Sequence, residues 1–235
     1  MGQAMKVKYS TVSGNEGISA GDPTNFSGGG GLVGGAETII LSSTVDSNAS
    51  DLAGGIFLID SYPLTASIIQ STISSNTARL GFGAISADTA LSIVGSTIAF
   101  NTSGQLANIG VLFNTTMELE SSIIADNGSV DVYGEVIAGS HNLIKAASID
   151  TIVPMDTITL DPKLQPLAYN GGSTRTHALG SGSPAIDSGI DSGSYPSDQR
   201  GPTYKRVIGN AADIGAYERD GDHIFGSTLE NPLIE

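Results

Sequence analysis

The aspartate and glutamate residues of this chain carry carboxyl groups that could catalyse hydrolysis. Hydrolysis of a glycosidic bond needs two carboxyl groups flanking the bond, one as proton donor and one as base or nucleophile. The first 131 residues supply seven candidates: Asp46, Asp60, Asp88, Glu118, Glu120, Asp126 and Asp131. These acids do not recur at one position of the repeat described below, so nothing aligns them. Asp60 and Tyr62 lie in FLIDSYPLTASIIQ (57–70), a stretch about three residues longer than its equivalent in later repeat units, and they are the best catalytic candidates.

A polysaccharide can also be cleaved by β-elimination, which needs a different set of groups. The base is a Lys or Arg side chain, and a bound Ca²⁺ usually neutralises the uronate carboxylate. Between Tyr9 and Ile144, Arg79 is the only basic residue apart from His141. A lyase would therefore need a basic side chain from the C-terminal region to reach over this part.

Metal and cofactor sites are weakly supported. Carboxylate and carbonyl oxygens are the ligands that Ca²⁺ prefers, and four aspartates of the C-terminal region could provide them: Asp187, Asp191, Asp198 and Asp213. The sequence contains neither a D-x-D-x-D-G loop nor a G-G-x-G-x-D repeat. The three histidines lack zinc-site spacing. We expect no cofactor, with these four aspartates as the only Ca²⁺ candidates.

His177 could in principle belong to a Ser-His-Asp triad. Ser181 or Ser183 could be the nucleophile and Asp187 the orienting acid. Nothing in the spacing requires this arrangement, and we expect His177 to be a structural hydrogen-bonding residue.

The glycine-rich stretch GGGGLVGG (28–35) matches the G-x-G-x-x-G pattern of dinucleotide-binding turns. Such a site needs a strand before the glycines and a helix after them. Here a turn-forming cluster, GDPTNFS, precedes them, and strand-like AETIILSSTV follows. We therefore interpret Gly30 as a corner of the repeat, equivalent to Gly55 and Gly83, and not as a nucleotide site.

A repeat runs through the first 130 residues. The segments STVSGN, STVDSN, STISSN, STIAFN and SIIADN resemble one another, and they end at Asn15, Asn48, Asn76, Asn101 and Asn127. The intervals between these asparagines are 33, 28, 25 and 26 residues. Apolar residues alternate with polar ones upstream, as at Leu91/Ile93, and this period of two indicates strands.

A repeat of about 25 residues without helical segments predicts a solenoid of β-coils. The expected fold is all-β: a right-handed parallel β-helix of about five coils with an irregular C-terminal cap. Equivalent residues would stack, so the five asparagines should form an amide ladder. The threonines at the second position of the units, Thr11, Thr44, Thr72 and Thr97, should point to solvent.

The repeat gives way to loop-rich sequence after Asn142. We expect β-helix coils over 6–144, the end of the β-helix and a cap over 145–220, and an acidic tail over 221–235. An uncovered β-helix end exposes strand edges and apolar surface, so the cap should lie over that end. Hydrogen-bonded charges should hold its loops, with Arg200 pairing an acid. These residues are Asp187, Asp198, Arg200, Asp213 and Glu218.

Two long motifs in this region carry a family resemblance. They read DPKLQPLAYNGGSTRTHALGSGSPAIDSG (Asp161–Gly189) and DQRGPTYKRVIGNAADIGAYE (Asp198–Glu218). The pattern resembles the C-terminal region of bacterial surface proteins of the choice-of-anchor or right-handed β-helix repeat type. That resemblance covers roughly residues 71–218. It implies a pectate-lyase-like β-helix at the cell surface or outside the cell, and it supplies no catalytic residues.

Composition excludes several functions. The net charge of −14 argues against nucleic acid and anionic membranes as partners. No apolar run approaches the roughly 20 residues that a membrane span needs, and the absence of cysteine excludes disulfides. MGQAMKVKY lacks the apolar stretch of an export signal, so we expect a fragment of an exported protein.

These observations favour a non-catalytic exported scaffold that contacts a polysaccharide or cell-surface glycan, as in adhesion. The alternative is a carbohydrate-active enzyme, either a polysaccharide lyase or a glycoside hydrolase. Carboxylates gathered within about 5 Å on one lateral groove would favour the enzyme.

Overall fold

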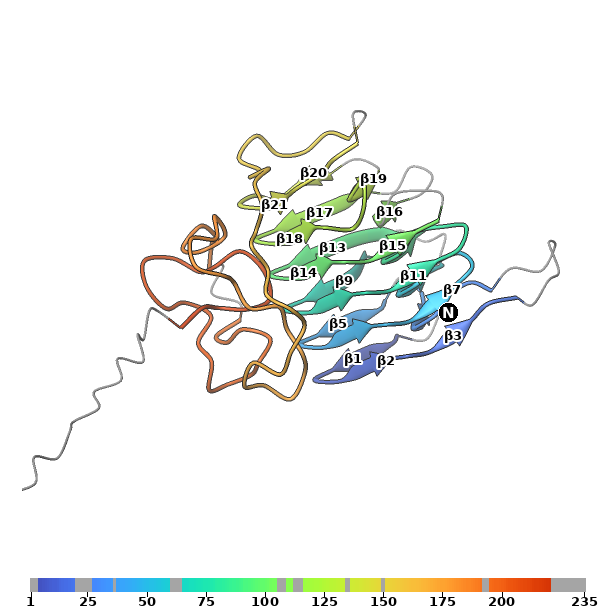
Figure 1. Ribbon diagram of the computed structural model, residues 1–235, viewed down its shortest axis with the longest axis horizontal. Helices are drawn as coiled ribbons and strands as arrows, with labels where there is room; N and C mark the ends of the chain where they lie inside the picture. The colour runs from blue at the N-terminus through green and yellow to red at the C-terminus, as the bar shows by residue number, and fades with distance from the viewer. Residues whose placement is uncertain are drawn as a thin grey trace, which may run out of the picture.

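The computed structural model describes residues 4–19, 27–35, 37–59, 65–104, 109–111, 116–133, 136–148, 151–191 and 195–220. Within these residues the protein is all-β and contains no helix, so no helix that could cross a membrane is found there. Its parallel sheets stack as a β-solenoid, which confirms the predicted all-β solenoid class (Figure 1). The predicted acidic tail, 221–235, lies outside the described residues.

Two of the four sheets have six strands each. Sheet A consists of β1 (Lys6–Lys8), β5 (Ile39–Leu41), β9 (Thr65–Ile69), β13 (Ala90–Val94), β17 (Met117–Glu120) and β20 (Val136–Ala138). Sheet B consists of β2 (Thr11–Ser13), β6 (Thr44–Asp46), β10 (Thr72–Ser74), β14 (Thr97–Ala99), β18 (Ile123–Ala125) and β21 (Leu143–Ile144). The chain passes from a strand of sheet A directly to a strand of sheet B in every coil.

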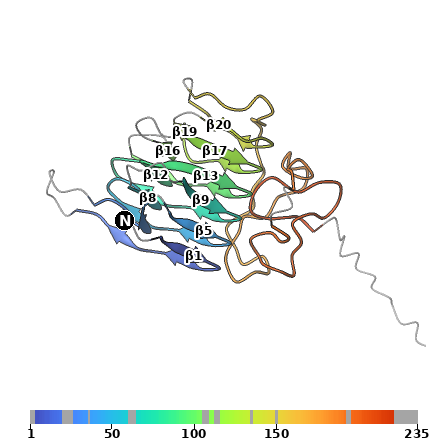
Figure 2. The same ribbon diagram turned by 180° about the vertical axis from the view of Figure 1, so that it is seen from behind.

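The other two sheets complete each coil. Sheet C consists of β3 (Glu16–Gly17), β7 (Ala49–Ser50), β11 (Thr77–Ala78) and β15 (Thr102–Ser103). Sheet D consists of β4 (Leu32–Gly34), β8 (Ile56–Leu58), β12 (Ile85–Ala87), β16 (Ile109–Val111) and β19 (Val132–Tyr133). The pairings between these strands are parallel, because each strand lies on its equivalent in the next coil (Figure 2).

The interior is filled by the apolar residues that alternate in the sequence. In sheet B, Val45 pairs with Ile73 and Ile73 with Ile98, and all three side chains are fully buried. In sheet A, Leu91 and Ile93 are buried in the same core cluster. Because short β-branched strands repeat in register, each coil contributes its apolar side chains directly above those of its neighbour.

Two columns of left-handed corners flank sheet B. The first comprises Tyr9, Ser42, Gln70, Gly95, Ser121 and His141, with φ between 45° and 55°. The second comprises Gly14, Ser47, Ser75, Phe100 and Asp126, with φ between 56° and 70°. Such corners are unfavourable for residues other than glycine. Here they are supported by backbone hydrogen bonds between coils, as from the Gln70 N–H to the Val94 carbonyl at 2.9 Å.

The glycine-rich stretch leads into a strand, β4, and not into a helix. The pairing of Leu32 with Ile56 and of Ile56 with Ile85 places Gly30 level with Gly54 and Gly83. The predicted equivalence of Gly30 with Gly55 is therefore wrong by one residue. A Cβ at Gly30 would lie 2.4 Å from the Gly54 carbonyl oxygen, so close approach of adjacent coils requires glycine there.

Of the predicted end and cap, 145–220, the described residues from 161 onwards do not cover the end of the solenoid, which corrects the position predicted for them. We call the described residues of 161–220 the C-terminal segment, and they lie along the outer face of sheet B (Figure 1, orange and red). The final strands are instead followed by 145–158, in which Ala147 bridges to Val132 and Ile158 to Leu143.

The predicted exposure of the threonine column holds for Thr11, which is exposed, and is wrong for the other three threonines, for the same reason. Thr44, Thr72 and Thr97 are at most 1% exposed because the C-terminal segment covers them. The Thr44 hydroxyl donates to the Arg175 carbonyl at 2.7 Å, and the Thr97 hydroxyl accepts from the Ala216 N–H at 3.0 Å. Further along, the outward side chains of sheet B are apolar, and they pack in a second cluster: Ile123, Ala125, Leu143, Leu179, Ala185 and Ile214.

Candidate functional site

The five asparagines singled out in the sequence lie in one column beside sheet B. Each side-chain amide donates to the amide oxygen of the next asparagine at 2.8 or 2.9 Å. The column ends at Asp131, whose carboxylate accepts from the Asn127 amide at 2.9 Å. Burial raises the pKa of Asp131. This carboxylate, one of the seven acids considered as catalytic candidates, is thus held inside the structure.

A second column, of serines, was not predicted. The backbone N–H of each serine donates to the side-chain oxygen one coil further on, at 3.0 to 3.2 Å. The members are Ser10, Ser43, Ser71, Ser96, Ser122 and, at the end, Asn142. The signal was present in the sequence, because a serine begins every repeat unit.

Arg79, the basic residue that a lyase mechanism would need, is held in an ion pair. Its Nε lies 2.7 Å from Asp51 Oδ1, and Asp51 is fully buried. The hydrogen bond from Arg79, followed by those from the Ser19 and Ser27 backbone N–H groups, holds the pKa of Asp51 well below its usual range. The pair therefore joins two adjacent coils.

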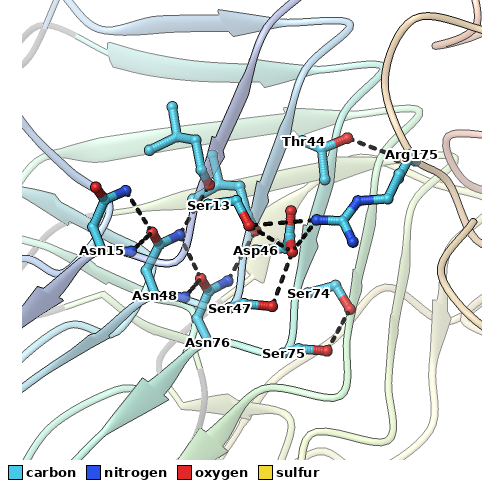
Figure 3. A network of polar contacts seen from close by, with 12 residues as sticks. Ser13, Asn15, Thr44, Asp46, Ser47, Asn48, Ser74, Ser75, Asn76 and Arg175 are labelled. Carbon is cyan, nitrogen blue, oxygen red and sulfur yellow. Dashed lines mark hydrogen bonds and ion pairs between the residues drawn. The ribbon is translucent and has the colours of Figure 1, made fainter.

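Asp46 connects the solenoid to the C-terminal segment (Figure 3). The fully buried Asp46 carboxylate accepts from Ser13 Oγ at 3.1 Å and from Ser47 Oγ at 2.9 Å. Arg175 Nη2 donates to it at 2.5 Å. The second carboxylate oxygen, Oδ1, and Arg175 Nε have no hydrogen-bond partner among the described residues.

His177 is paired with Ser74, a residue 103 positions away that the sequence did not suggest. His177 Nε2 lies 2.9 Å from Ser74 Oγ, and Nδ1 lies 2.8 Å from the Gln165 carbonyl oxygen. Since a carbonyl only accepts, Nδ1 carries the proton and Nε2 accepts from the serine hydroxyl. Burial lowers the pKa of His177, so the ring is neutral.

This pair does not form a usable nucleophile. Ser74 is fully buried and His177 is 2% exposed, so a substrate carbonyl could not reach the hydroxyl. The alternative triad with Ser183 and Asp187 is not assembled. Ser183 Oγ accepts from the Ala185 N–H, and Asp187 Oδ1 accepts from the Asn210 N–H. His177 therefore holds the C-terminal segment against sheet B.

Charged residues of the C-terminal motifs are buried together. Arg200 Nε donates to Asp198 Oδ2 at 2.9 Å, and the guanidinium lies 4.0 Å from the ring centres of both Tyr204 and Tyr217. Stacking between two aromatic rings stabilises a guanidinium cation that is buried away from water. The Asp213 carboxylate accepts from the Asp187 backbone N–H at 2.8 Å.

Glu218 is paired with Arg206, a residue that the sequence reading missed. Arg206 Nη1 lies 3.5 Å from Glu218 Oε2, and the same carboxylate accepts from the backbone N–H groups of Ile208 and Asp213, both at 2.8 Å. Burial raises the pKa of Glu218 to about 8, and it also raises the pKa of Asp198 and of Asp213.

The remaining site candidates do not form a centre. Among the described residues, no group of three or more acidic or histidine side chains could hold a metal ion. Of the four Ca²⁺ candidates, Asp198 forms an ion pair with Arg200, and the carboxylates of Asp187 and Asp213 accept hydrogen bonds from backbone N–H groups. The catalytic candidates Asp60 and Tyr62 lie outside the described residues.

A cavity of about 230 Å³ lies where the C-terminal segment meets the first corner column. The solenoid contributes Tyr9, Leu41, Ser42 and Gln70, and the C-terminal segment contributes Tyr195, Pro196, Ser197 and Pro202. A much smaller recess of about 10 Å³ adjoins it, sharing Gln70 and Tyr195. Neither motif nor spacing pointed to this cavity.

Gln70 stands between the cavity and the recess. It is a left-handed corner residue with φ of 45°, and it is 2% exposed. Its amide lies beside Gly95, where a Cβ would come within 2.7 Å of Gln70 Nε2. The amide oxygen Oε1 is buried and has no hydrogen-bond partner among the described residues.

Comparison of the chain with models of protein families, with curated proteins and with solved structures found no match.

Proposed function

We propose that this protein is a non-catalytic, exported scaffold of the bacterial surface β-helix type, and that it contacts carbohydrate. The observation that carries the proposal is the exposure of three tyrosines on the solenoid and its C-terminal segment. Tyr9, Tyr133 and Tyr169 are 57%, 52% and 68% exposed. An exposed tyrosine offers an apolar ring and a polar hydroxyl, a combination suited to a sugar ring with its C–H face and hydroxyl groups.

A non-catalytic role is supported by the state of the groups that a carbohydrate-active enzyme would use. Arg79 is paired with Asp51, and His177 and Ser74 are buried against each other. Asp131 closes the asparagine column. Each of these groups contributes to stability by satisfying a buried partner, and each would lose that role if it reacted with a substrate.

The proposal is tested by incubating the intact protein with a panel of neutral and acidic polysaccharides. We expect at least one neutral polysaccharide to retain the protein in an affinity gel, without release of reducing ends or unsaturated products. Product formation would show a carbohydrate-active enzyme instead. Failure of every polysaccharide to retain the protein would overturn carbohydrate contact.

A further inference from the structure

We propose that the cavity between the first corner column and the C-terminal segment binds a single neutral sugar ring. This inference rests on the proposed function, because it assigns carbohydrate contact to one site. The walls come from two parts of the chain that the Thr44 and Gln199 hydrogen bonds hold together. The site exists only when the C-terminal segment is in place.

The size and shape of the cavity limit what it can hold. Its volume of about 230 Å³ is below the range of roughly 300–1,000 Å³ that drug-sized ligands occupy. A single sugar ring is of suitable size, whereas an extended peptide or two linked sugar rings would be too large. Tyr9 is 57% exposed at the rim, where a further part of a glycan could contact it.

The lining selects an uncharged ligand with hydroxyl groups. None of the described residues that line the cavity is charged. Tyr195, Pro196 and Pro202 provide apolar surface for the C–H face of a ring, and Ser42 and Ser197 provide hydroxyl groups. A uronate would find no cation here, and it would be repelled by a protein with a net charge of −14.

Gln70 is the residue that points to a ligand. A buried amide oxygen without a hydrogen-bond partner destabilises the folded protein, and Gln70 Oε1 has none among the described residues. Because this oxygen is buried beside Gly95, a sugar hydroxyl could donate to it once the Gln70 side chain turns towards the cavity, which it also lines. The adjoining recess of about 10 Å³ could hold no more than one water. A bound water there is the competing way to satisfy the same oxygen.

The test measures binding of methyl glycosides of glucose, galactose and N-acetylglucosamine by saturation-transfer NMR. Galacturonic acid and a polyproline peptide are tested in parallel. Gln70→Gly removes the amide, and it is compatible with the left-handed backbone because glycine adopts positive φ without strain. His141→Gly is the matched control, since His141 occupies the same corner column with φ of 55° and does not line the cavity. Ser197→Tyr fills the cavity from the other wall.

We expect one neutral glycoside to bind the wild type and His141→Gly alike, and to bind Gln70→Gly and Ser197→Tyr at least about ten-fold more weakly. Equal binding to all four proteins would overturn the cavity as the site, as would preference for galacturonic acid or for the peptide. If no glycoside binds the wild type, the Gln70 oxygen is satisfied by water and the proposal fails.

The polysaccharide gel separates this proposal from the general one. If a polysaccharide retains wild type and Gln70→Gly equally, carbohydrate contact stands and the cavity is not its site. If neither polysaccharide nor glycoside binds, both proposals fail.

Discussion

Asn76 shows, at the scale of a single residue, how one side chain joins three coils. It is fully buried, and its oxygen accepts from the backbone N–H and the amide of Asn48 at 3.0 and 2.9 Å. Its own amide donates to the Val45 carbonyl and to Asn101 Oδ1, both at 2.9 Å. All the hydrogen-bonding capacity of the side chain is used, which is what a buried amide requires.

Replacing Asn76 with alanine should therefore destabilise the protein by about 2–4 kcal/mol, because buried donors and acceptors on both neighbouring coils lose their partner. Chemical denaturation followed by circular dichroism measures the change. Asn15→Ala is the control, since Asn15 lies at the exposed end of the column, where its backbone N–H and its amide both donate to Asn48. Equal losses for the two variants would contradict the role of the column.

The C-terminal segment is the element whose position decides which surfaces are exposed. Its described residues form no β-strand. Their regular backbone pairing consists of four isolated antiparallel bridges: Leu164–Leu179, Ala168–Thr176, Ser197–Lys205 and Val207–Ala212. Its attachment depends on side chains. Gln199, 2% exposed, accepts from Thr72 Oγ1 at 2.6 Å and donates to Thr44 Oγ1 at 3.0 Å.

Gln199→Ala should loosen the C-terminal segment from sheet B without unfolding the solenoid. The lost hydrogen bonds amount to about 2 kcal/mol, which corresponds to a roughly 30-fold larger population of the detached segment. Hydrogen exchange resolved by mass spectrometry would show faster exchange in the segment and unchanged exchange in β10. Gln165→Ala, at an exposed glutamine of the same segment, should leave both unchanged.

Glu218 makes the stability of this element depend on pH. Its pKa in the folded protein is about 8, against an ordinary value of 4.5, so the folded state holds a proton that the unfolded state has lost between these values. The contribution of Glu218 to stability is then complete below about pH 4.5 and is lost as the pH rises towards 8.

Glu218→Gln, which cannot titrate, should reduce this dependence by up to about 1.4 kcal/mol per pH unit. Thermal unfolding of the two proteins between pH 5 and pH 8 measures it. The slope is the readout, since the substitution also changes the absolute stability. Parallel curves for wild type and variant would show that Glu218 is ionised in the folded state.

At the scale of the whole molecule, the net charge decides which polymers can approach the protein. With 24 acidic and 10 basic residues, the protein repels polyanions. The described residues that line the cavity at Gln70 are uncharged, so the association that we propose there does not depend on ion pairs.

Affinity for a neutral glycan should thus change by less than about two-fold between low and high salt, because screening acts only on charges. Affinity gels run at both salt concentrations measure this, with heparin as the polyanion control, which should not retain the protein at either concentration. Strong salt dependence for the neutral glycan would show that charged residues outside the cavity bind it.

The sequence by itself determined the solenoid. A period of about 25 residues and short β-branched strands are local features, and stacking identical units in register leaves little choice of fold. The burial of Val45, Ile73 and Ile98 and the alignment of the asparagines follow from that register. The serine column could have been predicted in the same way, because Ser43 and its equivalents repeat as regularly as the asparagines do.

Only the tertiary structure decided where the C-terminal segment lies, and with it the candidate site. The pairs His177–Ser74 and Arg175–Asp46 join residues 103 and 129 positions apart, and neither contact recurs from coil to coil. No periodic pattern predicts such a contact, since it depends on how an irregular chain packs against outward-facing side chains of sheet B. The cavity at Gln70 could not be predicted either, because only one of its walls belongs to the repeating solenoid and the other is the irregular C-terminal segment.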